Sequence, residues 1–239
     1  MIDELLAPKY LGWLLHGFFT TIALAVVVCA CATVLGFVLC VLRAIERYGV
    51  SVAVRAYLSV FRNTPLLVQL FFWYFGVSSL FPEGWLEWLN TPHTWRVFAL
   101  HVTWPPFEYL AGFVGLTLYT SAFVAEELRA GVRAVSPGQV AAGLAQGFTP
   151  IQVWRHIVMP QALRIALGPV LGQYMNAVKN SSLTMAIGLA ELSYASRQVE
   201  TETFKTFQAF GVATALYIAL IVLIEWGGQY LRRRAAYPH

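Results

Sequence analysis

Charged residues are scarce in this chain of 239 residues, and their absence over long stretches excludes an ordinary soluble domain. Lys, Arg, Asp and Glu together make up 12% of the sequence, whereas 58% of it is hydrophobic. Four long runs carry no charge at all: 10–42, 63–82, 109–125 and 206–224. A fifth run, residues 165–190, carries only Lys179. Because a helix needs about 20 apolar residues to cross a bilayer, these runs predict five transmembrane helices.

Motifs that would indicate an enzyme are also missing. The chain contains no G-x-x-x-x-G-K-[ST] loop, so it is not expected to bind the phosphates of ATP by that route, and it has no HExxH or GxSxG sequence. Its three cysteines, Cys29, Cys31 and Cys40, fall in the first apolar run without CxxC spacing. We expect buried structural thiols there, no metal site and no catalytic residues.

The charges that are present divide into two groups of opposite character. Ten arginines and one acid, Glu46, lie in segments 43–55, 129–164 and 232–234. The alternate segments, 1–12, 82–108 and 190–205, hold four basic and eight acidic residues. Since Lys and Arg accumulate on the cytoplasmic side of a membrane, this pattern predicts an N-terminus outside the cytoplasm and a cytoplasmic C-terminus. The net charge of +4 thus reflects topology and requires no nucleic acid.

We therefore predict an all-α integral membrane protein in which residues 1–239 form a single transmembrane domain. The segment between the third and fourth spans, about 131–160, is expected to be a cytoplasmic loop. The spans are expected at about 11–42, 57–81, 107–130, 161–189 and 205–231.

The loop contains clear signals for two short helices. Ser136-Pro137-Gly138-Gln139 supplies an N-cap serine, proline at the first helical position and glutamine as the reciprocal member of a capping box. Thr149-Pro150-Ile151-Gln152 repeats the pattern, with Gly147 between them as a C-cap. We expect helices over about 137–146 and 150–159, the second ended by Pro160.

The first of these helices consists mostly of small residues, and Gly143 costs about 1 kcal/mol of helix propensity relative to alanine. Two interpretations account for this. The helix packs closely against its own protein, or it is a projection that enters a groove of a partner protein.

The loop resembles the cytoplasmic EAA loop of permease subunits of ATP-binding-cassette (ABC) importers, in the branch that transports polar amino acids. The residues that carry the resemblance are Gly138, Gln139, Ala142, Gly143, Gly147, Gln152, Ile157 and Pro160. Four further stretches are similar to the same permeases: YLGWLLHGFFTTIALA, FRNTPLLVQLFFWYF, VAEELRAGVRAV and VKNSSLTMAIGLAEL. Ala141 departs from the family pattern, which has the first Glu of EAA there, and this puts one polar contact with the ATPase in doubt.

The resemblance implies the type I ABC importer architecture, with the short helix as the coupling helix. It also implies a location in the bacterial inner membrane and three kinds of partner: a cytoplasmic ABC ATPase dimer, a second permease subunit, either the same or paralogous, and a periplasmic solute-binding protein. ATP and Mg²⁺ would be bound by the ATPase, with no cofactor in this chain. Glutamate/aspartate permeases are the most similar members, so glutamate or aspartate is the expected substrate.

Polar residues in the apolar runs are candidates for the substrate pathway. Lys179 is the first, because a charge inside a span is costly and is by default functional; snorkelling or pairing with a partner's carboxylate is the structural alternative. Asn63 and Pro65 are candidates for a helix kink that lines the pathway, or for packing features. The remaining candidates are Asn176, Asn180 and Ser181.

Four charged residues, Arg62, Glu126, Glu127 and Arg129, lie toward the expected inner ends of their spans. Glu126 and Arg129 are three residues apart and so are able to face each other on a helix. Structural ion pairs or snorkelling are favoured for these residues over a cytoplasmic gate.

Two other functional classes remain open at this point. An ion-gradient-driven secondary transporter or a channel subunit would need no ATPase, but such folds commonly have repeated halves, and no internal repeat is visible here. An intramembrane enzyme would need a positioned nucleophile, a metal set or an acid/base pair, and the sequence offers none.

Overall fold

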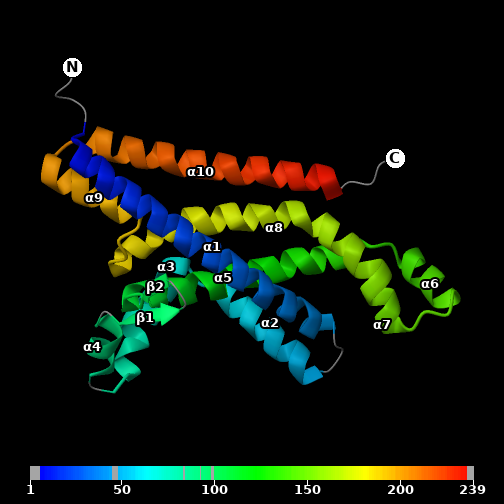
Figure 1. Ribbon diagram of the computed structural model, residues 1–239. Helices are drawn as coiled ribbons and strands as arrows, with labels where there is room; N and C mark the ends of the chain where they lie inside the picture. Colours follow the sequence, from blue (N-terminus) through cyan, green and yellow to red (C-terminus); the bar gives the residue numbers. More distant parts are fainter. Residues whose placement is uncertain (1–5, 45–47, 83, 92, 98–99, 236–239) are drawn as a thin grey trace.

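The computed structural model describes residues 6–44, 48–82, 84–91, 93–97 and 100–235, and this part of the chain is almost wholly helical. Figure 1 shows its long helices running between two ends of the molecule. The helices are α1 (Pro8–Ala44), α2 (Tyr48–Asn63), α3 (Leu66–Phe71), α4 (Trp85–Asn90), α5 (Phe107–Ala134), α6 (Pro137–Ala145), α7 (Pro150–Val153), α8 (Met159–Ser181), α9 (Leu192–Thr203) and α10 (Thr206–Ala235). An antiparallel hairpin, β1 (Thr94–Val97) and β2 (Leu100–Thr103), was not foreseen from the sequence.

Among the described residues, three helices are long and apolar enough to cross a membrane: Pro8–Ala44, Phe107–Ala134 and Thr206–Arg233. The fourth expected span corresponds to α8, which contains Pro169 and continues as a 3₁₀ turn, Ser182–Ile187. The second expected span is divided into α2, α3 and a π-helical turn, Phe72–Gly76. The division of the chain into five spans therefore remains a prediction.

A break separates α2 from α3 at Pro65, where the sequence indicated a kink. Proline has no N–H, so the carbonyl oxygen four residues earlier, on Phe61, loses its helical donor. The side chain of Gln69 supplies the substitute: its Nε2 donates to the carbonyl oxygens of Phe61 and Thr64, each at 3.0 Å. The break is therefore stabilised within the chain.

The core forms where α5 packs between α1 and α8. Glycine permits the closest approach: a Cβ atom on Gly131 of α5 would lie 2.5 Å from the carbonyl oxygen of Ala162 on α8. The cysteines of α1 differ from expectation in one case. Cys40 is buried and Cys29 is half-buried, but Cys31 is exposed, because α1 is apolar on all sides and only part of its surface meets other helices.

Figure 1 places α6, α7 and the C-terminal end of α10 at one end of the molecule, and α4, the hairpin and α9 at the other. The end of α1 and the start of α2 lie on the side of α6 and α7. The helix ends that belong to the three arginine-rich segments thus lie at one end of the molecule. This agrees with the charge pattern, which predicts that all three segments lie on the same side of the membrane.

Candidate functional site: a capped loop and a polar pocket

The helix α6 begins at a serine cap. Ser136 Oγ accepts a hydrogen bond from Gly138 N at 3.3 Å, and Pro137 occupies the first turn. The acceptor bond goes to the second helical N–H and not to that of Gln139, and no side-chain bond from Gln139 back to Ser136 N is found among the described residues, so the expected capping box is not formed. The serine cap and the proline in the first turn agree with the expectation from the sequence, and the capping box does not.

The helix α6 ends in a Schellman motif centred on Gly147, which has φ +87°. Phe148 N donates to Gly143 O at 3.2 Å, and Gly147 N donates to Leu144 O at 3.0 Å. Only glycine adopts this left-handed conformation without strain. Gly147 therefore sets the sharp turn toward α7.

The helix α7 begins with a complete capping box. Thr149 Oγ1 accepts from Gln152 N at 3.4 Å, and Gln152 Oε1 accepts from Thr149 N at 2.8 Å. The expected end at Pro160 is wrong. The chain continues from α7 through a π-helical turn, Trp154–Val158, into α8, which has Pro160 in its first turn.

Gly143 is buried where α6 packs on α7 and the π-helical turn. A Cβ atom on it would lie 2.5 Å from Ile157 Cδ1 and 3.0 Å from Val153 Cγ2. The close-packing interpretation of the small residues therefore holds for this face. The neighbouring Ala141 and Ala142 are exposed, and Ile151 at the start of α7 is 78% exposed, so another face of the loop is available to a partner.

A polar pocket of about 190 Å³ lies between α5 and α8. Of the residues proposed for the substrate pathway, Asn176 and Asn180 line it. The sequence reasoning missed the others, although Gln173 lies one helical turn before Asn176 and so signalled a polar face. The missed lining residues are Tyr119, Thr120, Phe123, Gln173 and Ala177.

The other proposed pathway residues lie elsewhere. Lys179 is exposed and does not line the pocket. Ser181 is fully buried and donates to Val178 O at 2.7 Å. Asn63 is exposed and donates to Ser59 Oγ at 3.3 Å, and Pro65 marks the break before α3.

Three of the four charged gate candidates, Arg62, Glu126 and Glu127, contact side chains on other elements. Glu126 forms an ion pair with Arg43 of α1, so its partner is not Arg129, the neighbour expected from helical spacing. Glu126 pairs with a residue of another helix because α1 and α5 pack side by side, which brings Arg43 within reach of its carboxylate. Arg62 lies over the ring of Phe123, with 5.5 Å between Cζ and the ring centroid.

Glu127 connects these charges to the pocket. Its Oε1 accepts a hydrogen bond of 3.0 Å from Gln173 Nε2, and Gln173 lines the pocket with Phe123, over which Arg62 lies. Asn176 Nδ2 in turn donates to Gln173 Oε1 at 3.4 Å. A carboxylate, amides and hydroxyls thus follow one another along α5 and α8, and Arg62 of α2 adds a guanidinium beside Phe123. This arrangement is able to bind a small polar solute.

A buried carboxyl group at the opposite end was also missed. Glu191 caps α9 by accepting from Tyr194 N at 2.9 Å, and its Oε2 accepts from Tyr217 Oη at 2.7 Å. Burial raises the pKa of Glu191, while hydrogen bonds from Tyr217, the backbone of Ser193 and Tyr194, and Thr21 act in the opposite direction. The sequence did offer a signal: an acidic residue stands directly before the first residue of the helix, where its side chain is able to act as an N-cap.

Comparison with known proteins decides the family. A family model described as "Binding-protein-dependent transport system inner membrane component" matches residues 49–237. The chain belongs to this family. It is therefore a transport subunit of the inner membrane, and ATP hydrolysis takes place in separate subunits.

Curated relatives of this transport family extend over nearly the whole chain. The chain is 33% identical to the probable glutamine ABC transporter permease protein GlnM of Bacillus subtilis over 222 residues, which cover 92% of each protein. It is 32% identical to the glutamate/aspartate import permease protein GltJ of Escherichia coli, covering 96% of this chain and 89% of that one. The octopine transport system permease protein OccM of Rhizobium meliloti is also 32% identical, covering 94% and 89%. The resemblance to amino acid ABC permeases is thus confirmed.

Solved structures show the same fold. A crystal structure of an amino acid ABC transporter with histidines superposes with a TM-score of 0.80 at 24% identity, covering 95% of both chains. An inward-facing structure of the MetNI methionine ABC transporter gives a TM-score of 0.77 at 19% identity, covering 97% of this chain and all of that one. The expected permease architecture is therefore confirmed.

Proposed function

We propose that this chain is a permease subunit of an ATP-driven importer that carries a polar amino acid across the inner membrane. Its partners are a dimeric cytoplasmic ABC ATPase that binds ATP and Mg²⁺, a second permease subunit and a periplasmic solute-binding protein. The N-terminus is periplasmic and the C-terminus cytoplasmic. Family membership supports the importer, and the names of the relatives support an amino acid as the substrate.

The capped loop is the coupling element in this proposal. The supporting observation is that α6 is held rigidly on its own chain through Gly143 and Gly147, while its outer residues Ala141 and Ala142 remain exposed. A rigid projection transmits movement of the ATPase to α8, into which α7 continues. ATP binding then shifts the permease between two states, as a ligand does that binds one state better.

The pocket between α5 and α8 lies on the substrate passage in this proposal, with Asn176, Asn180, Gln173 and Glu127 as the polar groups that a solute meets. Glutamate or aspartate is the first substrate to test, because GltJ carries that name. Relatives named for glutamine and octopine make both of these the necessary competitors in the assay.

The test of coupling is co-purification of the tagged chain from its host, with the co-eluting proteins identified and quantified. The variant Gly147→Arg introduces strain at φ +87° and crowds the outer surface, so we expect the nucleotide-binding protein to be lost. Gly49→Arg is the matched control, because Gly49 lies at the start of α2 with no neighbouring atom within 4 Å of its Cβ position. A wild-type chain that elutes without an ATPase in several mild detergents would overturn the proposal in favour of an ion gradient.

A further inference from the structure

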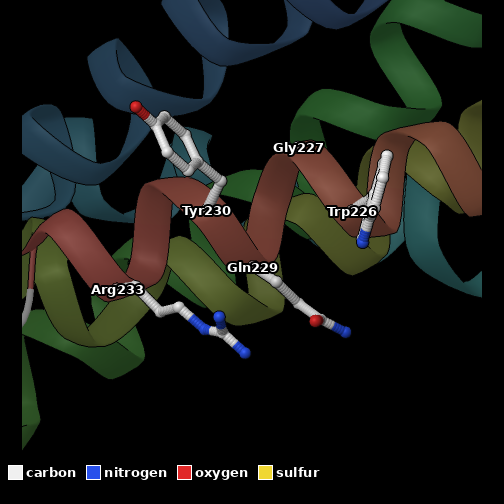
Figure 2. A pocket seen from close by; sticks show the side chains of 5 residues that line it. All are labelled: Trp226, Gly227, Gln229, Tyr230 and Arg233. Carbon is white, nitrogen blue, oxygen red and sulfur yellow. The ribbon is translucent and has the colours of Figure 1, made fainter.

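The last turns of α10 carry a stripe of large polar side chains that the transport cycle does not use. Trp226, Gln229, Tyr230 and Arg233 recur at intervals of three and four residues, so they share one face of the helix. Together with Gly227 they line a surface hollow of about 390 Å³ (Figure 2). Trp226 is 74% and Tyr230 55% exposed, which leaves the rings accessible.

The charge in this hollow is positive. Arg233 has no carboxylate within 4 Å among the residues that the structure describes. Its neighbour Arg232 differs, because it forms an ion pair of 3.0 Å with Glu225, to which Gln229 Nε2 also donates at 3.2 Å. Within the described part of the chain, the charge of Glu225 is thus balanced by Arg232, and the guanidinium of Arg233 faces no carboxylate.

The hollow lies where the apolar part of α10 ends. Val222 and Leu223, on the preceding turn, are exposed apolar residues, and the helix is long and apolar enough to cross a membrane. Arg233 at the far end of the hollow belongs to the run Arg232-Arg233-Arg234. Along α10 the exposed residues are therefore first apolar, then aromatic, then basic. A bilayer has the same order from its centre outward: acyl chains, interface and headgroups.

We propose that this hollow binds the headgroup of an anionic phospholipid, with the phosphate on the guanidinium of Arg233 and the rings of Trp226 and Tyr230 at the level of the glycerol. An indole N–H and a guanidinium are donors only, which suits phosphate oxygens. The site depends only on α10 crossing the membrane, so it goes beyond the proposed transport function and holds for any substrate.

Trp226 is the reporter for the test. The complete transporter is reconstituted in nanodiscs that contain either brominated phosphatidylglycerol or brominated phosphatidylcholine with the same acyl chains. The difference in fluorescence between the wild type and Trp226→Phe isolates the emission of Trp226. We expect stronger quenching by the anionic lipid. Arg233→Gln should reduce this preference about fivefold, since one basic side chain near an anionic surface contributes about that factor.

Arg55→Gln is the control, because it removes the same charge from an exposed position on α2. It should leave the lipid preference unchanged. Equal quenching by the two lipids would overturn the proposal, because the stripe would then contact bulk lipid without a preference for its headgroup. An equal loss of the preference in both arginine variants would also overturn it, in favour of general surface charge. Absence of quenching by either lipid would mean that another protein covers the stripe. Removal of the preference by soluble glycerol phosphate would assign the hollow to a free phosphate ester, and would also overturn the proposal.

Discussion

Tyr217 on α10 donates a hydrogen bond of 2.7 Å to the carboxyl group of Glu191, which is fully buried at the start of α9. Ser193 lies 3.0 Å from the same tyrosine oxygen, and Thr21 of α1 accepts from Leu192 N at 3.2 Å. Thr21 Oγ1 also donates to Glu191 Oε2 at 3.5 Å, so α1 meets the consecutive helices α9 and α10 at one carboxyl group, although it is distant from both in sequence. A buried polar cluster of this kind is stable only while each member keeps its partners.

Tyr217→Phe is expected to lower the free energy of unfolding by about 1–3 kcal/mol, because it leaves a buried oxygen of Glu191 without its short hydrogen bond. Thermal melting of the purified transporter measures the effect. Tyr48→Phe, at a position 83% exposed, is the matched control. Identical melting of the two variants would show that the hydrogen bond does not stabilise the fold.

Gly143→Ala is expected to destabilise the capped loop by about 1–3 kcal/mol, because the new methyl group would overlap Ile157 Cδ1. Ile157→Ala removes that atom, so the double variant should recover part of the loss. Limited proteolysis of the loop and retention of the ATPase are the two measurements. Gly172→Ala, where no neighbouring atom lies within 4 Å of the Cβ position, serves as the control. Strict additivity of the two substitutions would argue against the contact.

The ion pair between Arg43 and Glu126 joins α1 to α5 in a half-buried position. Reversing either charge alone is expected to cost about 3 kcal/mol, because two like charges then face each other in a poorly solvated site. The double variant Arg43→Glu with Glu126→Arg should restore much of the melting temperature. If the double variant melts no higher than the worse single variant, the two residues do not act as a pair.

Asn176→Leu is expected to reduce uptake of the amino acid severalfold, because it replaces an amide that lines the polar pocket with an apolar group that offers the solute no hydrogen bond. Lys179→Met should leave uptake and selectivity unchanged, since Lys179 is exposed outside the pocket. Competition uptake assays with glutamate, aspartate, glutamine and octopine distinguish the two variants. A change of selectivity with Lys179→Met would instead place this lysine on the substrate passage.

Features that depend on neighbours in the sequence were predicted well. The N-cap serine at Ser136, the capping box at Thr149 and the left-handed Gly147 all follow from the local chemistry of a few adjacent residues. At Pro65 the structure selects the kink from the two alternatives that the sequence left open. The continuation of α7 through a π-helical turn was missed, because Pro160 reads as a helix end when α8 is not known to begin around it.

The sequence by itself determined that the chain is a helical membrane protein with a capped loop, since charge-free runs and capping residues act through local hydrophobicity and backbone hydrogen bonding. Only the tertiary structure decided which polar groups meet. Glu126 pairs with Arg43 and Glu191 with Tyr217 across many residues, and Asn176 faces the pocket while Lys179 does not. The physical reason is that helices apolar on every side carry no periodic signal for their buried face, so packing alone sets their rotation and their partners.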